Sequence, residues 1–336
     1  MEKGSADRPL RPEKDVAIAI DLGGTNLRLG LVEESGEIIH GKKQPTPGNR
    51  ESILQSIQTL IADGFDFCAS ARCRVVGIGI STGGQVDFRS GVIVSATSLI
   101  PNWSNVPLRE IIGGRFNVPV FVDNDGNCFA RAEKRFGKGN GLDNFIALVL
   151  GTGIGGGIYV DGKPLRGAGN FAAEIGHVSV DANGPGCSCG GRGCIELFAS
   201  GSGIARWASE NPLLRHLAGP NGEFTSRMIG DASRAGDSSA TALLIAAGEK
   251  LGVAMAGMVN VFNPECIIIS GSLLDLESPY LDTFRSTVMR RAMKANAEQL
   301  RIEISDLPQE GGILGAASLA FDAFEEAAGV SHAAPE

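Results

Sequence analysis

The 336-residue sequence has few cysteines, no long run of basic residues and no long uncharged apolar stretch. Seven cysteines spread over the whole chain are too few for a disulfide framework, which favours a reducing compartment. No uncharged apolar segment approaches the roughly 20 residues that cross a bilayer, and no apolar signal segment precedes the first expected strand. The formal net charge of −8 argues against nucleic acid or an acidic membrane as the main partner. We therefore expect a cytoplasmic protein that acts on small molecules.

Glycine is the residue in excess. The 47 glycines are about twice the usual share, and they are clustered in loops. The chain is about twice the length of a typical single domain, which leaves room for two lobes with a cleft between them. Residues 1–15 and 329–336 are expected to be frayed tails, because the first segment is polar and the second is rich in Ala and Pro.

A first glycine loop joins two expected strands near the N-terminus. Residues 16–20 form a buried apolar run, Asp21 to Asn26 supply turn residues, and residues 27–32 resume as a strand. Such a hairpin can present backbone N–H groups and hydroxyls to phosphate oxygens. Asp21, at the end of the first strand, is of the type that holds Mg²⁺ together with water and phosphate.

A second glycine loop has the same setting. Residues 145–150 are expected to form a strand, residues 151–157 the loop, and residues 158–160 a further strand before a turn at Asp161 and Gly162. The loop satisfies the dinucleotide pattern G-x-G-x-x-G, but that pattern requires a helix to follow, whereas a hairpin is expected here. Either loop alone is equally explained as a tight turn with positive φ. The two together favour a nucleoside triphosphate.

A polar pair follows a third expected strand. Residues 119–123 are predicted to form the strand, and residues 128–136 are predicted to form a helix. Asn124 and Asp125 then lie at a strand-to-helix junction. Asp125 can accept the proton of an attacking hydroxyl while Asn124 orients the same molecule. An Asn-Asp turn on its own is more often structural.

Three thiols and an imidazole with zinc-ligand chemistry occur close together at His177, Cys187, Cys189 and Cys194. Four such ligands complete a tetrahedral shell and leave no position for a catalytic water, so the ion would be structural. The alternative is a pair of redox thiols beside an ordinary histidine. The second imidazole nitrogen would face a substrate hydroxyl or another partner. The interleaved carboxylates Glu174 and Glu196 are left free for ligand binding.

Six motifs occur in a fixed order along the chain: DLGGTNLR from Asp21, STGG from Ser81, VDNDGNC from Val122, GTGIGGGI from Gly151, AAEIGH from Ala172 and CSCGGRGCIE from Cys187. In this combination the chain resembles the ROK family of sugar kinases and repressors, most closely the N-acylmannosamine kinases, with the ROK glucokinases next. The resemblance implies an α/β fold of the actin and hexokinase type. It also implies a small lobe of residues 16–137 and 312–328, and a large lobe of residues 138–311 with the zinc motif.

The resemblance also implies roles for individual residues. Nucleotide and magnesium contacts would fall to Asp21, Gly23, Gly24, Thr25, Asn26, Arg28, Thr152, Gly153 and Gly271. Sugar contacts would fall to Gly84, Gln85, Thr97, Asn124, Asp125, Glu174, His177 and Glu196, with Asp125 as the base for the C6 hydroxyl. Structural Zn²⁺ would be held by His177, Cys187, Cys189 and Cys194. Members of the family are often dimers or tetramers, so a homo-oligomer is expected.

The expected reaction is phosphorylation of the C6 hydroxyl of a hexose or N-acylhexosamine by MgATP, with N-acetylmannosamine as the favoured acceptor. Gln85 stands where the mannosamine kinases carry Arg, which keeps glucokinase as the alternative. A transcriptional regulator is disfavoured, because about 15 residues before the first strand are too few for a helix-turn-helix. A sugar-binding protein without catalysis is disfavoured because Asp125 is present.

Overall fold

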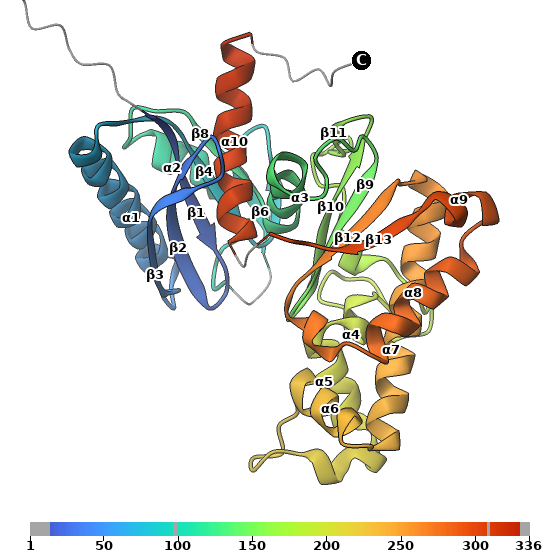
Figure 1. Ribbon diagram of the computed structural model, residues 1–336. Coiled ribbons are helices and arrows are strands. Elements are labelled where there is room, and N and C mark those ends of the chain that lie inside the picture. The colour runs from blue at the N-terminus through green and yellow to red at the C-terminus, as the bar shows by residue number, and fades with distance from the viewer. Residues whose placement is uncertain (1–13, 97–99, 308–309, 330–336) are drawn as a thin grey trace, which may run out of the picture.

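The computed structural model describes residues 14–96, 100–307 and 310–329. It consists of two bodies, each built on a five-stranded sheet, with helix α3 (Asp125–Phe136) lying between them (Figure 1). This mixed α/β architecture, with two bodies flanking a central helix, agrees with the expected fold class.

The first sheet has the strand order β3-β2-β1-β4-β8. Its strands are β1 (Lys14–Leu22), β2 (Asn26–Glu33), β3 (Ile38–Pro45), β4 (Cys73–Thr82) and β8 (Val120–Asn124). β1 pairs antiparallel with β2 and parallel with β4, and β8 pairs parallel with β4. The carboxyl ends of β1, β4 and β8 therefore lie at one edge of the sheet, where Asp21, Ser81 and Asn124 are found.

Side chains alternate along β1 and supply two separate cores. Ile18 and Ile20 pack with helices α1 (Arg50–Ala71) and α2 (Leu108–Gly113), whereas Ala17 and Ala19 pack with α10 (Gly311–Ala327). The small side chains of the second face let α10 approach closely: a Cβ on Gly79 would lie 1.7 Å from the Ala316 carbonyl oxygen. The last helix of the chain thus completes the body formed by its first strands.

A small sheet extends from the first body. It contains β5 (Gln85–Asp87), β6 (Val92–Ser95) and β7 (Val106–Pro107), all paired antiparallel. Trp103, which is 1% exposed, closes its base and donates a hydrogen bond of 3.0 Å from its indole nitrogen to the Thr82 hydroxyl. The hairpin that carries Gln85 is therefore anchored to the end of β4.

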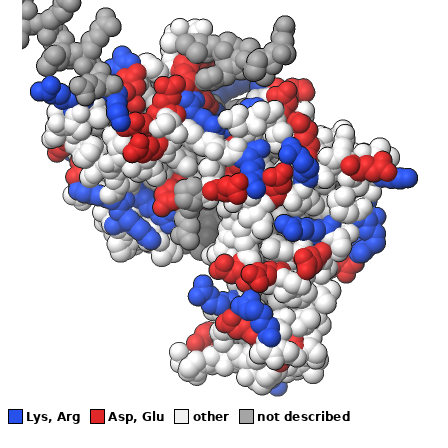
Figure 2. Space-filling model, in the orientation of Figure 1, with Lys and Arg blue, Asp and Glu red and all other residues white. Residues whose placement is uncertain are grey.

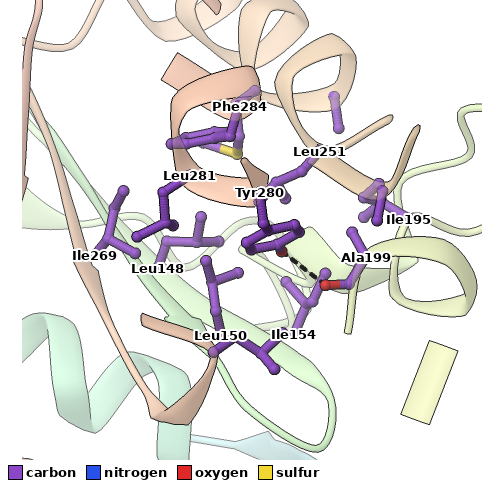
Figure 3. Packing of buried hydrophobic residues seen from close by; sticks show 14 of the residues in the cluster. Leu148, Leu150, Ile154, Ile195, Ala199, Leu251, Ile269, Tyr280, Leu281 and Phe284 are labelled. Atoms are coloured by element: carbon purple, nitrogen blue, oxygen red, sulfur yellow. Dashed lines mark hydrogen bonds between the residues drawn. The ribbon is translucent and has the colours of Figure 1, made fainter. Parts of the chain in front are cut away.

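The second sheet has the order β11-β10-β9-β12-β13. Its strands are β9 (Phe145–Leu150), β10 (Ile154–Val160), β11 (Lys163–Pro164), β12 (Cys266–Ser270) and β13 (Arg301–Ile304). Helical segments accompany this sheet: η1 (Ile175–His177), α4 (Glu196–Ala199), α5 (Gly201–Glu210), η2 (Pro212–Leu217), α6 (Ser226–Arg234), α7 (Ser238–Phe262), η3 (Ser272–Leu276), α8 (Tyr280–Arg291) and α9 (Lys294–Gln299). Tyr280 lies at the centre of its core and donates a 2.7 Å hydrogen bond to the Ala199 carbonyl oxygen (Figure 3).

Within the described ranges, α7 is the one helix long and apolar enough to cross a membrane by length and composition. One side of this helix packs into the core of the second body. A Cβ on Gly248 would lie 2.4 Å from the Tyr280 carbonyl oxygen, and one on Gly252 would lie 2.5 Å from Thr287 Cβ. These glycines let α7 and α8 approach, as expected for a closely packed scaffold helix.

Helix α3 contacts both bodies. Ala132 belongs to the core beneath α10, whereas Phe129 and Ala130 pack with β9 and β10 of the second sheet. A Cβ on Gly157 of β10 would come within 2.5 Å of Ala130 Cβ, so glycine is needed at this crossing. The first residue of α3, Asp125, is thereby placed where the two bodies meet.

Several element boundaries differ from the sequence-based expectation. β1 begins at Lys14, so the last two residues of the expected tail are strand, while residues 1–13 lie outside the described ranges. The second glycine loop is shorter than expected, because β10 begins at Ile154 and includes Gly155 to Gly157. Gly155 and Gly157 face α3, whereas a Cβ on Gly156 would meet Ala147 and Ile175, so none of the three lines the loop. The hairpins at both loops and the strand-to-helix junction at Asp125 are confirmed.

Candidate active site

Asp125 is the first residue of α3, and its side chain is open to solvent although protein surrounds it on most sides. These surroundings raise the pKa of Asp125 to about 6, against the hydrogen bond that the carboxylate accepts from the Gly126 backbone N–H. The negative charges of Asp21 and Glu174 contribute to this rise in pKa. Residues from β1, α3 and η1 are therefore brought into one acidic site.

Asp21 lies on β1 opposite Arg28 in the hairpin register. Burial raises the pKa of the Asp21 carboxyl, while Arg28 and a 3.2 Å hydrogen bond from the Ser81 hydroxyl oppose that rise. A Cβ on Gly312 would lie 2.5 Å from Asp21 Oδ1, so the carboxylate lies directly against the first turn of α10. An oxygen ligand of this kind suits Mg²⁺.

Glu174 and Glu196 come from the second body, at the start of η1 and of α4. Burial raises the pKa of Glu174, His177 lowers it, and Glu196 raises it again. The Glu196 carboxylate accepts a hydrogen bond of 2.9 Å from the Ile154 backbone N–H. Glu196 therefore links this pair of acids to the second glycine loop.

Both glycine loops are held by hydrogen bonds. In the first loop the Thr46 hydroxyl donates to the Gly23 carbonyl at 2.7 Å, and Gly24 and Thr25 are exposed. In the second loop Thr152 is exposed, and its carbonyl accepts a 2.8 Å hydrogen bond from the Ser202 hydroxyl.

Gly271 adopts a φ of +108° beside the second loop, and a Cβ there would lie 2.2 Å from the Leu150 carbonyl oxygen. The nearest side chain that a Cβ on Gly151 would meet is the Ser272 hydroxyl, at 4.0 Å. Gly271, one of the expected nucleotide contacts, thus lies directly against the start of the second glycine loop.

An open cavity of about 450 Å³ lies next to the second loop, within the size range of ligand pockets. It is lined by Ser226, Arg227, Asp231, Arg234, Ser272, Asp275 and Leu276. The Ser226 hydroxyl is 3.3 Å from the position of a Cβ on Gly201, whose backbone N–H donates to the Gly151 carbonyl at 2.8 Å. The cavity is therefore continuous with the glycine loop. The sequence reading did not identify it, apart from the neighbouring Gly271.

The expected sugar contacts from the first body have internal partners. The Asn124 side chain caps α3 by accepting from the Gly126 and Asn127 backbone N–H groups, and it donates to the Gly84 carbonyl at 3.0 Å. Gln85 accepts a 3.0 Å hydrogen bond from the Ser95 hydroxyl across the hairpin. Thr97 lies outside the described residues. Asn124 thus ties the Asp125 turn to the residue preceding Gln85.

His177, Cys187, Cys189 and Cys194 do come together. Their ligand atoms all lie within 4.8 Å of one another. Cys187 Sγ is 3.6 Å from His177 Nδ1, and the Sγ atoms of Cys189 and Cys194 are 3.6 Å apart. Ligands around a tetrahedral zinc ion are separated by about 3.5 to 3.8 Å, given Zn–S and Zn–N bonds of about 2.3 and 2.0 Å. The four residues therefore fit Zn²⁺, and His177 Nε2 is left for another partner.

Sequence reasoning missed a buried ion pair behind the acidic site. The Arg166 guanidinium donates to both Asp123 carboxylate oxygens, at 2.9 and 2.7 Å. The two residues are 43 positions apart and come from different bodies. No local pattern in the sequence links them.

The sequence was compared with known protein families and proteins. The model of the ROK family matches residues 17–323. A glucokinase of Thermotoga maritima is 36% identical over 310 residues, which cover 90% of this chain and 96% of that protein. A xylose repressor of Caldicellulosiruptor bescii is 33% identical over 315 residues, which cover 91% of this chain and 78% of the repressor.

Solved structures agree with the sequence relatives. A ROK family glucokinase from Streptomyces griseus, in complex with glucose and AMPPNP, is 32% identical and superposes with a TM-score of 0.76, over 91% of this chain and 99% of that one. A Listeria monocytogenes protein, described as a candidate N-acetylmannosamine kinase, is 28% identical with a TM-score of 0.73, over 92% and 99% of the two chains. The chain belongs to the ROK family.

Proposed function

We propose that this protein transfers the γ-phosphoryl group of ATP to the C6 hydroxyl of a hexose or N-acylhexosamine. Its family and its glucokinase relatives make it an ATP-dependent sugar kinase. The observation that carries the finer proposal is that Asp21 and Glu174 both lie close enough to Asp125 to raise its pKa. A base, a magnesium ligand and a hydroxyl-binding acid are the groups that this transfer needs.

Asp125 acts as the base in this scheme. A carboxylate with a pKa of about 6 is ionised at neutral pH and still basic enough to take a proton from an alcohol as the alcohol attacks phosphorus. The hydrogen bond from the Gly126 N–H fixes one carboxylate oxygen. The other oxygen is then free to accept the hydroxyl proton.

The phosphates are assigned to the two glycine loops, and the nucleoside to the cavity beside Ser226 and Ser272. Asp21 would hold Mg²⁺, which neutralises charge that develops on the phosphate oxygens. Exposed Gly24, Thr25 and Thr152 offer backbone and hydroxyl donors to the same oxygens.

Glu174, His177 and Glu196 are assigned to sugar hydroxyls. A zinc ion held by His177 and the three cysteines would fix the loop that carries this set, and its role would be structural. His177 would bind through Nδ1, which leaves Nε2 to orient a hydroxyl.

Glucose is the first acceptor to test, because the Thermotoga maritima and Streptomyces griseus relatives are named glucokinases. N-acetylmannosamine, favoured by the sequence motifs, is the second, and the Listeria monocytogenes structure supports it. Gln85 lies in the hairpin where a contact to an N-acyl group would fall, held by Ser95.

The experiment is a coupled ADP-release assay with MgATP and a panel of glucose, mannose, N-acetylmannosamine and N-acetylglucosamine. Turnover with at least one acceptor, lost in Asp125→Ala, is the expected result. Product analysis should find phosphate on C6. Failure to phosphorylate any member of the panel, in protein shown to be folded and metal-loaded, would contradict the proposed reaction.

A further inference from the structure

Arg166 follows the short strand β11 and crosses from the second body to the end of β8 in the first. Its guanidinium donates in parallel to both oxygens of Asp123, whose side chain is 1% exposed. Such a fork fixes the relative orientation of the two groups as well as their distance. The pair is one of the connections between the two bodies next to the acidic site.

Asp123 connects Arg166 to the turn at Asn124 and Asp125, which is called the catalytic turn below. Its Oδ1 also accepts a 2.8 Å hydrogen bond from the Asn124 backbone N–H and a weaker one, at 3.4 Å, from the Asn127 side chain. Asn124 caps α3, and Asp125 is the first residue of that helix. A change in the position of Asp123 therefore moves the turn that aims the Asp125 carboxylate.

The other side of Arg166 contacts the hairpin of Gln85. The guanidinium carbon lies 4.1 Å from the centre of the Phe88 ring, within the range of a cation–π contact. Four residues later, Asn170 donates to Asp87 Oδ1 at 2.9 Å. Asp87 in turn accepts from the Ser90 hydroxyl at 2.6 Å, which shapes the end of the hairpin.

The segment from Arg166 to Ala173 leads directly into Glu174. Asn170 and Ala173 adopt φ values of +64° and +70°, so the path of the segment is sharply turned. Its hydrogen bonds to Asp123 and Asp87 fix where that path begins and crosses the first body. The same segment thus has Glu174, a proposed sugar contact, at one end. At its other end it has Arg166, which binds Asp123 next to the catalytic turn.

We propose that Arg166 is a positioning residue for phosphoryl transfer, which sets Asp125 through Asp123 and sets Glu174 through residues 166–173. This role rests on the proposed function. It differs from simple stabilisation, because stability and rate can be measured separately. Removing one partner of a buried ion pair leaves the other charge unpaired and lowers stability, so Arg166→Gln should lower the melting temperature. The positioning role predicts, in addition, a loss of kcat in protein that is still folded.

The test compares Arg166→Gln with the wild-type protein in steady-state kinetics at a temperature well below both melting points. Misplacing a reacting group by about 1 Å costs roughly a hundredfold in rate. We expect kcat to fall by about that factor and KM for the sugar to rise. KM for ATP should stay unchanged, because the hydrogen bonds described for the second loop and its cavity do not involve Arg166.

A matched control is Arg135→Gln in the last turn of α3, which breaks comparably buried ion pairs with Glu325 and Asp322 of α10. It should lower the melting temperature with little change in kcat. Arg166→Lys keeps the positive charge but cannot donate in parallel to both oxygens of Asp123, so it should lose part of kcat. This variant tests the proposal even if Arg166→Gln folds poorly. The paired variant Asp123→Asn with Arg166→Gln restores an uncharged amide contact and should recover part of the lost kcat.

The proposal is overturned if Arg166→Gln and Arg166→Lys, both folded, keep wild-type kcat, or if Arg135→Gln loses as much kcat as they do. In either case the kinase activity of the wild-type protein would stand. Absence of turnover in the wild-type protein itself would overturn the proposed function and this role with it.

Discussion

The Glu196 carboxylate accepts a hydrogen bond from the Ile154 backbone N–H at 2.9 Å, and so connects the cysteine-rich loop to the second glycine loop. A Cβ on Gly153 would lie 2.5 Å from Glu196 Oε2, so a side chain there would displace this carboxylate. One carboxylate thereby serves the proposed sugar side and the proposed phosphate side.

Replacing Glu196 should therefore affect both substrates. A hydrogen bond to a charged group contributes about 1.5 to 3 kcal/mol, so Glu196→Ala should raise KM for the sugar and for ATP by roughly tenfold to a hundredfold. Glu196→Gln keeps an acceptor for the Ile154 N–H and should affect ATP less. Steady-state kinetics with each substrate varied in turn provides the measurement. A change in KM for the sugar alone would contradict the link to the glycine loop.

The pH dependence of the reaction should report Asp125. Its pKa is raised from 3.8 to about 6, chiefly by the protein that surrounds it. The base must be ionised, so kcat/KM for the sugar should level off above about pH 6 and fall close to tenfold per pH unit below it. Asp125→Asn should reduce the rate by about a hundredfold to ten thousandfold and remove this limb. An acid limb near pH 4 would show that the pKa of Asp125 is not raised, and an acid limb near pH 6 that persists in Asp125→Asn would show that Asp125 is not the titrating base.

Loss of the metal cluster should weaken the fold and the sugar site together. Structural zinc contributes about 10 to 16 kcal/mol in small peptides, so Cys189→Ser should lower the melting temperature and raise KM for the sugar through His177 and Glu174. Cys73→Ser, at a half-buried thiol outside the cluster, should do neither. Elemental analysis and thermal melts test this. Purified wild-type protein without bound zinc would refute it.

The contact between α3 and β10 should tolerate no side chain. A Cβ on Gly126 would lie 2.4 Å from the Gly156 backbone nitrogen, so Gly126→Ala should destabilise the protein by about 1 to 3 kcal/mol and displace Asp125. A Cβ on Gly257, within α7, meets nothing within 4 Å. Gly257→Ala should therefore stabilise the protein by about 0.5 to 1 kcal/mol. Denaturant unfolding of both variants checks the contrast, and equal effects would contradict it.

The parts of the site that sequence reasoning found are those set by local pattern. The turn residues after Asp21 and the strand-to-helix junction at Asp125 depend on neighbours in the chain, and the structure has them as expected. Clustering of His177 with the three cysteines was predicted from the ligand chemistry of residues close in sequence.

The parts that it missed depend on contacts between distant segments. Gly155 to Gly157 were expected in a phosphate loop, yet they are strand residues, and the missing side chain of Gly157 makes room for α3. Arg166 has no local signal, because its partner Asp123 is on a different sheet. The cavity at Ser226 is formed by α6 and η3, which only the folded chain brings together.

The position of α10 at the end of the chain affects how the first body folds during translation. Ala17, Ala19 and Val76 are covered by Ile313, Ala316 and Phe321, which are synthesised almost three hundred residues after β1. One face of the earliest sheet therefore stays uncovered through nearly the whole of translation. The nascent polypeptide must keep this face from aggregating until the final helix emerges from the exit tunnel, which makes an early stop codon costly even when it removes only the last turns.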